Sequence, residues 1–209
     1  GYASSILFFS TSIGIGLSIA ASALVSPAIG ANLRVRARRL SAHAHVLAFA
    51  ISAAFSLVLW FLIPNLLSLL GAAGRTHALA ADYLEILIPT LPFLAMGMAS
   101  TAVLRSVGDA RSAMYVTMGA AIVNVLLDML LILKLGWGIE GAAIASAIAR
   151  VAVTAIGFYG VVWVHDLMSR PKLATLANDV RPFMQIAVPA MLTNIATPVG
   201  NAYVTAAMA

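Results

Sequence analysis

The sequence contains no cysteine, and only 9% of its residues are charged. Without cysteine, disulfide bonds and thiolate metal sites are excluded, and the redox compartment stays open. A soluble domain carries about 25% charged residues, because water must solvate its surface. A content of 9% is too low to cover a globule of 209 residues. Most of the surface must therefore face an apolar environment, in agreement with the 62% of hydrophobic residues.

Motifs of the common enzyme classes are absent as well. The chain has no H-E-x-x-H, no G-x-S-x-G and no phosphate-binding loop. We place all of its histidines in or beside loops, at His43, His45, His77 and His165. His43 and His45 are two residues apart and so lie on different faces of a helix, which argues against a shared metal ion. We expect no enzymatic activity, no metal site and no organic cofactor.

The net charge of +5 does not indicate a nucleic-acid partner. The basic residues lie in short breaks between apolar runs, and they form no basic face with stacking aromatics that a nucleic-acid backbone could follow. We therefore expect membrane lipid, and no nucleic acid, among the partners of this chain.

Six apolar runs are each long enough for a helix that crosses a bilayer, which needs roughly 20 residues. The runs are Tyr2–Gly30, about Val46–Leu70, Ile86–Leu104, Ala113–Leu133, Ala142–Val164 and Pro182–Ala209. Transmembrane strands would instead alternate apolar and polar residues over about 10 residues. Because these runs are continuously apolar, the predicted fold class is an all-α integral membrane protein.

The distribution of Lys and Arg predicts the orientation of these spans. The breaks after the first, third and fifth spans hold Arg34, Arg36, Arg38, Arg39, Arg105, Arg111, Arg170, Lys172 and Arg181. The breaks after the second and fourth spans hold only Arg75 and Lys134. By the positive-inside rule the first set is cytoplasmic, in an inner membrane of bacterial type. Residue 1 then lies outside, so we expect a fragment that an odd number of helices, most simply one, precedes.

Polar residues inside the spans are the candidates for function, because ionisable groups at membrane depth are costly. Asn124 and Asp128 are spaced i, i+4 in the fourth span, and Ser146 and Arg150 have the same spacing in the fifth. We predict that Asp128 is a carboxylate in a polar cavity that binds a proton or a small cation. A structural ion pair with Arg150, or an Arg150 that extends toward a headgroup, is the alternative.

The fourth and fifth spans are expected to form a helical hairpin centred on Trp137. Asp128 and Ser146 are each nine residues from Trp137, and Asn124 and Arg150 are each thirteen residues away. In a straight antiparallel hairpin, residues equally far from the centre share a depth. The hairpin would then carry two polar layers, one of carboxylate and hydroxyl and one of carboxamide and guanidinium.

Several segments resemble the multidrug and toxic compound extrusion (MATE) family. The segments are Leu104–Arg111 (LRSVGDAR), Asn124–Asp128 (NVLLD) and Gly138–Ser146 (GIEGAAIAS). The family pattern reads approximately L-R-G-x-G-D-x-[RK], N-x-x-L-D and G-[LV]-x-G-A-A-[LI]-A-[TS]. Pro27–Ala31 resembles the short cytoplasmic turn after the second family helix, and Pro189–Pro198 resembles the DinF-like branch. The resemblance covers nearly the whole chain and keeps the order and spacing of the motifs.

The resemblance implies a fold of two six-helix bundles around a central cavity. This chain would form a MATE-like six-helix bundle that consists of five helices of the first bundle and the first helix of the second bundle. Residues 1–169 would form the first bundle without its first helix, 170–181 a cytoplasmic linker, and 182–209 the start of the second bundle. The remainder of the chain would be an obligatory partner.

The resemblance also implies an antiporter that exports drugs or other amphipathic or cationic small molecules in exchange for protons or sodium ions. Asn124, Asp128 and Ser146 match the helix-five Asn and Asp and the helix-six hydroxyl of the DinF-like ion site, so sodium is a candidate ligand of Asp128 and Asn124. Arg150 has no counterpart in that site and is a candidate modulator of coupling. The alternatives are a flippase of lipid-linked oligosaccharides, whose cavity would hold more basic residues, and a non-transporting membrane subunit.

Overall fold

The computed structural model describes residues 2–69, 74–171 and 173–207, and it describes side chains for residues 6–68, 74–171 and 175–196. Within these ranges the chain is built from helices and turns, without a strand. The helices are α1 (Tyr2–Gly30), α2 (Arg34–Leu69), α3 (Gly74–Leu87), α4 (Leu91–Ser106), α5 (Ala110–Asp128), α6 (Gly138–Tyr159) and α7 (Leu173–Ala207). The predicted all-α fold class is confirmed.

Shorter helical segments extend or join these elements. A 3-10 turn over Ile88–Thr90 connects α3 to α4, so that the two helices form one long element. Segments of π-helix over Met129–Lys134 and Gly160–Val164 continue α5 and α6. The helices are therefore as long as a bilayer requires, although each of three elements changes its hydrogen-bond pattern along its length.

Five elements among the described residues are apolar and long enough to cross a membrane. They are Ile6–Gly30, Arg34–Ser68, Gly74–Ser106, Ala110–Lys134 and Gly138–Val164. These segments overlap the first five predicted spans, and Leu70 at the end of the second lies outside the described residues. The sixth predicted span extends past residue 196 and so lies partly outside the described side chains.

The observed helices begin earlier than the predicted spans. Helix α2 begins at Arg34 rather than near Val46, and α7 begins at Leu173 rather than at Pro182. Hydropathy marks the apolar part of a helix and not the polar turns that precede it, which explains both differences. Residues 173–181 of the predicted linker are thus helical, and the division of the chain into two bundles stays a prediction.

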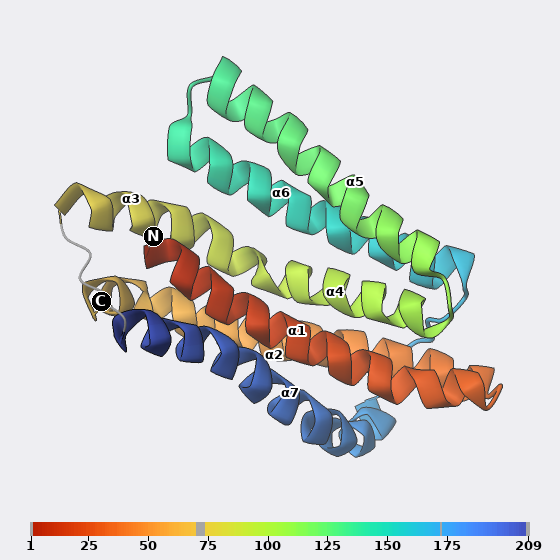
Figure 1. Cartoon of the computed structure of the whole chain (residues 1–209). Helices are drawn as coiled ribbons and strands as arrows, with labels where there is room; N and C mark the ends of the chain where they lie inside the picture. Colours follow the sequence, from red (N-terminus) through yellow and green to blue (C-terminus); the bar gives the residue numbers. More distant parts are fainter. Residues whose placement is uncertain (1, 70–73, 172, 208–209) are drawn as a thin grey trace.

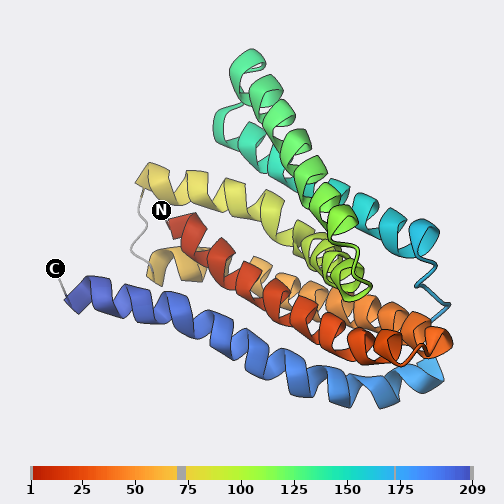
Figure 2. The same ribbon diagram turned by 45° about the vertical axis from the view of Figure 1, so that its right-hand side comes forward.

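The helices pack in layers, with α7 on one side and the α5–α6 hairpin on the other (Figure 1). Helix α7 lies along α1, and α1 and α2 contact α4, which in turn contacts α6. The turns at 31–33, 107–109 and 165–171 lie together at one end of the bundle, and the described ends of the chain lie toward the other end (Figures 1 and 2). We call the end that holds these turns the basic end, because Arg34–Arg39, Arg105, Arg111 and Arg170 lie there.

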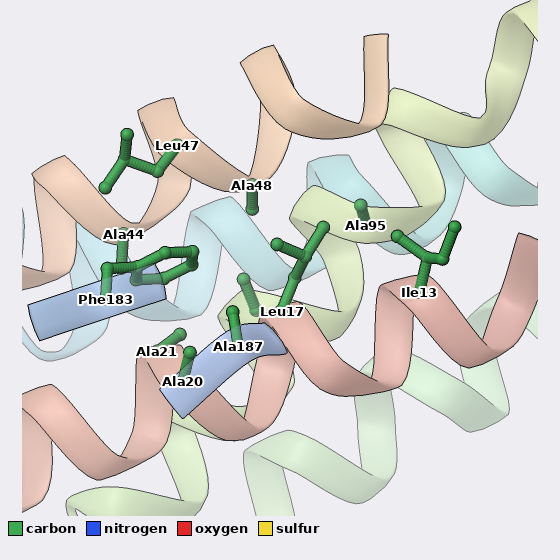
Figure 3. Close-up of a cluster of buried hydrophobic side chains, with 11 residues drawn as sticks. Ile13, Leu17, Ala20, Ala21, Ala44, Leu47, Ala48, Ala95, Phe183 and Ala187 are labelled. Carbon is green, nitrogen blue, oxygen red and sulfur yellow. The ribbon is translucent and has the colours of Figure 1, made fainter. Parts of the chain in front are cut away.

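Small side chains make the centre of the bundle. A buried cluster joins Ile13, Leu17, Ala20 and Ala21 of α1 to Ala44, Leu47 and Ala48 of α2, Ala95 and Ala99 of α4, and Phe183 and Ala187 of α7 (Figure 3). Phe183 is completely buried among these alanines. Alanine and glycine allow helix axes to approach closely, which is how helices gain packing energy when lipid removes the hydrophobic driving force. At Gly16 a β-carbon would collide with Met191 of α7.

The matched segment Leu104–Arg111 forms the turn between α4 and α5. Gly108 has φ +83°, a left-handed conformation that glycine adopts without strain. Asp109 caps α5 by accepting a hydrogen bond from the Ser112 N–H at 2.9 Å, and it contacts His165 Nε2 at 2.7 Å. The hydrogen bonds from Ser112, with a smaller contribution from His165, hold the pKa of Asp109 well below its usual range. The glycine and aspartate of this motif therefore shape the turn and fasten it to the end of α6.

A glycine at the α4–α6 contact gives a direct test of this packing. A β-carbon at Gly97 would collide with the Val153 side chain and approach the Thr154 backbone nitrogen to 3.2 Å. We expect Gly97→Ala to lower the free energy of unfolding of the intact protein in detergent by about 1–3 kcal/mol, the usual effect of overpacking. Gly30→Ala is the matched control, because a β-carbon there meets nothing within 4 Å. Equal thermal midpoints for the two variants would contradict the close contact between α4 and α6.

Candidate functional site

The predicted polar residues lie on the α5–α6 hairpin, whose helices run antiparallel and meet through Leu135–Trp137. The hairpin expected from the sequence is confirmed. Asn124, Ser146 and Arg150 line one cavity of about 350 Å³, together with Ala120, Ala121, Ala149 and Val153 of the hairpin and Leu94 of α4. The structure thus brings a carboxamide, a hydroxyl and a guanidinium to a single cavity on the face of the hairpin that meets α4.

Asp128 is the last residue of α5, one turn beyond Asn124, and its side chain is half-buried. It is not among the residues that line the cavity. Within the described residues it has no hydrogen-bond or ion-pair partner, so the ion pair with Arg150 that the sequence left open is not formed. A π-helix over Met129–Lys134 follows Asp128, so the stretch between Asp128 and Trp137 is not the straight α-helix on which the depth count was based.

Arg150 reaches across to the junction of α3 and α4. Its Nη1 donates to the carbonyl oxygen of Leu87 at 2.8 Å and to Thr90 Oγ1 at 2.9 Å. At this junction the Leu91 N–H donates to the Ile88 carbonyl rather than to Leu87, and the Leu87 carbonyl also accepts a hydrogen bond from the Thr90 hydroxyl at 2.7 Å. Backbone groups at such a break must find new partners where water is excluded. Arg150 therefore adds a charged donor to the backbone at the break between two helices, in addition to lining the cavity.

A double-mutant cycle tests this role of Arg150. We expect Arg150→Gln to lower the unfolding free energy of the intact protein by about 1.5–3 kcal/mol, the range for hydrogen bonds to charged groups. Thr90→Val should lower the unfolding free energy less, because the Arg150 guanidinium retains its hydrogen bond to the Leu87 carbonyl. The two effects should fall short of additivity by roughly 0.5 kcal/mol or more. Arg111→Gln, at an exposed arginine on α5, serves as control, and strictly additive effects would contradict the contact.

Two buried histidines were missed by the sequence analysis. The prediction that His43 and His45 lie in or beside loops was wrong, because α2 already begins at Arg34 and both lie within it. Their side chains are 1% and 2% exposed. Both histidines lie in the polar first part of α2, which hydropathy does not mark as a helix, and the i, i+4 spacing of Ser41 and His45 was the available signal.

The two histidines point to different neighbours. His43 Nδ1 lies 2.6 Å from Asp179 Oδ2 of α7. His45 Nδ1 lies 2.8 Å from the Ser41 carbonyl oxygen, and its Nε2 lies 2.9 Å from Ser100 Oγ of α4. Because a carbonyl only accepts, Nδ1 of His45 carries a proton. Among the described residues, no group of three or more His, Cys, Asp or Glu side chains is placed to hold a metal ion.

Comparison with known proteins places these features in a family. The family model described as MatE matches residues 1–130. A protein of Shewanella oneidensis named "FAD transporter" is 31% identical over 205 residues, which is 95% of this chain and 45% of that protein. The Bacillus subtilis protein named "Probable multidrug resistance protein YoeA" is 26% identical over 151 residues, which is 70% of this chain and 33% of that protein. The chain thus spans about half the length of the curated relatives it matches, or less.

Solved structures share the fold. A MOP superfamily transporter from Pyrococcus furiosus superimposes with a TM-score of 0.86 at 21% identity, over 95% of this chain and 45% of that one. An outward-facing MATE family transporter gives a TM-score of 0.85 over 94% of this chain and 44% of its own length, again at 21% identity. The present chain therefore has the fold of these transporters. The family-model match and the 31% identity to the Shewanella protein show that the chain belongs to the MatE family.

Proposed function

We propose that this chain supplies most of one bundle of a cation-coupled exporter of amphipathic small molecules in an inner membrane. Membership of the MatE family and the relatives named for multidrug resistance and export support transport of drug-like compounds. The observation that carries the coupling part is the cavity on the α5–α6 hairpin, which Asn124, Ser146 and Arg150 line, with Asp128 one turn away. No step of this function requires enzymatic chemistry.

The proposed ion site consists of oxygen atoms from two helices. The Asp128 carboxylate, the Asn124 carboxamide oxygen and the Ser146 hydroxyl would share a proton or a sodium ion. A carboxylate without a fixed partner among the described residues is able to change its protonation or ion occupancy, whereas one locked to Arg150 would not. Because Arg150 is bound to Leu87 and Thr90, its positive charge stays near the site without occupying the carboxylate.

Coupling then follows from differential binding. An ion shifts a conformational equilibrium only by as much as it prefers one state over the other. Asp128 and Asn124 lie on α5 and Ser146 lies on α6, so ion binding would hold the two helices of the hairpin in one arrangement. Export would proceed when the substrate favours the arrangement from which the ion has left. Arg150, which joins α6 to the α3–α4 junction, would transmit the change to the neighbouring helices.

Removal of the carboxylate tests the coupling role. We expect Asp128→Asn in the intact protein to reduce pH- or sodium-driven drug efflux from vesicles by about 100-fold or more. A neutral amide neither takes up and releases a proton nor offers a negative charge to a sodium ion. Expression, insertion and thermal midpoint should stay close to those of the unchanged protein. Glu140→Gln is the matched control, since this acid lies exposed in the first turn of α6 on the same hairpin. Efflux by Asp128→Asn at the original rate would rule out Asp128 as the coupling residue.

A second candidate cargo is flavin adenine dinucleotide, because the relative named "FAD transporter" covers 95% of this chain. Transport of flavin nucleotide and of a cationic dye such as ethidium should be compared in the same vesicles containing the intact protein. Our first proposal expects ethidium to be exported and FAD not. Saturable FAD transport that ethidium does not inhibit would instead assign the dinucleotide as cargo, with the same ion site retained.

A further inference from the structure

A second polar cavity lies at the basic end of the bundle, away from the α5–α6 hairpin site. It has a volume of about 1140 Å³ and is formed where the turn between α1 and α2 meets the connection from α6 to α7. Arg34, Arg36, Arg39 and Arg170 all line it. The first three come from the start of α2, and the fourth lies more than 130 residues later in the sequence. The fold therefore gathers guanidinium groups from two distant segments around one space.

The local backbone adds to this positive environment. Helix α1 ends in a tight reversal in which the Asn32 N–H donates to the Ile29 carbonyl and the Leu33 N–H donates to the Ala28 carbonyl. Asn32 has φ +58°, the left-handed conformation that such a helix end requires. Helix α2 starts two residues later, so its first turn lies at the wall of the cavity. The free N–H groups and the macrodipole of a 36-residue helix favour a negative charge at this position.

Most of the arginine charge in the cavity is not balanced by acids. Arg34, Arg36 and Arg170 are exposed and have no ion pair among the described residues. Arg39 lies 3.6 Å from an Asp179 oxygen that His43 contacts more closely, and its buried Nε has no hydrogen-bond partner. No acidic residue is among those that line the cavity in the described part of the chain.

The neighbouring Arg38 shows what a structural arginine looks like at this end. Its Nη2 lies 3.0 Å from Asp166 and, with Nε, contacts the Met168 carbonyl, which fastens the connection after α6 to α2. This anchor holds Ser169 and Arg170 opposite the start of α2. Arg38 itself does not line the cavity. The structure thus separates an arginine that fixes the wall from arginines that stay available to a ligand.

Apolar side chains lie beside the charges. Leu33 and Val35 also line the cavity, and they are 49% and 85% exposed. A small soluble anion would leave both uncovered, whereas an amphiphile would place its phosphate on the arginines and its hydrocarbon against these two residues. Arg is the side chain best suited to phosphate, because its planar group donates two parallel hydrogen bonds. Basic pockets between helices on the cytoplasmic side are typical sites for anionic lipid headgroups.

We propose that the arginine-lined cavity at the basic end is a specific binding site for a phosphate group, and that an anionic phospholipid fits it better than a soluble phosphate. The site is distinct from the coupling residues on the α5–α6 hairpin, and it does not depend on the proposed export activity. Occupation would join the start of α2 to the connection that leads into α7, so the lipid would stabilise the contact between these two segments.

The test measures lipid retention by the intact protein, purified in neutral detergent, with native mass spectrometry during titration with phosphatidylglycerol. We expect Arg34→Gln combined with Arg170→Gln to weaken lipid binding about tenfold or more, since each arginine near an anionic headgroup adds to the affinity for the lipid. The matched control is Arg105→Gln combined with Arg111→Gln, which removes the same charge at the same end without touching the cavity. The control pair should bind as the unchanged protein does.

Two further measurements distinguish the sources of the phosphate and keep the test independent of folding. Inorganic pyrophosphate should bind more weakly than phosphatidylglycerol and compete with it; tighter binding of pyrophosphate, sensitive to the same variants, would assign the site to a soluble phosphate and overturn the preference for lipid. In the unchanged protein, lipid affinity should fall as salt is raised, because partly exposed charges are screened. Equal loss in both variant pairs, or an affinity that salt does not alter, would overturn the proposed site.

Discussion

The backbone of this protein must satisfy its polar groups without water, and most of its structure follows from that constraint. Long helices meet it internally over nearly their whole length. Where α3 passes into α4, the chain changes to a 3-10 turn, and the Leu91 N–H donates to Ile88 instead of Leu87. Arg150 of α6 and the Thr90 hydroxyl both donate to the Leu87 carbonyl. The guanidinium at membrane depth thus has a carbonyl and a hydroxyl of another element as partners, and this contact joins the α5–α6 hairpin to the α3–α4 junction.

Close approach of the helices depends on residues with little or no side chain. Gly97 and Gly157 bring α4 and α6 together around Val153 and Ser100, and Gly16 admits Met191 of α7. These contacts replace the hydrophobic effect, which is weak between helices surrounded by lipid. Because backbones are close at these positions, the polar side chains around them have little freedom. One example is His45 of α2, whose Nε2 lies 2.9 Å from Ser100 Oγ of α4 inside the bundle.

Charge divides the molecule into two regions with different chemistry. The α5–α6 hairpin carries few ionisable groups, and one of them, Asp128, has no ion-pair or hydrogen-bond partner among the described residues. The basic end carries many, and there Asp109, Asp166 and Asp179 each contact a histidine or an arginine from another segment. A sparse site would suit the reversible ion binding that we propose for Asp128, since no fixed counter-charge competes for the carboxylate. A crowded end suits structural bonds, and the arginines left over there form the proposed phosphate site.

The sequence by itself determined the membrane class, the first five spans, the hairpin and the family, because long apolar runs and motif spacing are local properties of the chain. It also predicted that Asn124 and Arg150 share a depth, and these two residues line one cavity together with Ser146. Only the tertiary structure decided what Arg150 binds, since its partner carbonyl lies at a helix break 63 residues earlier. The same holds for His43 with Asp179 and for the arginines around the second cavity. Such pairings depend on how helices distant in sequence are packed, and residue periodicity carries no information about that.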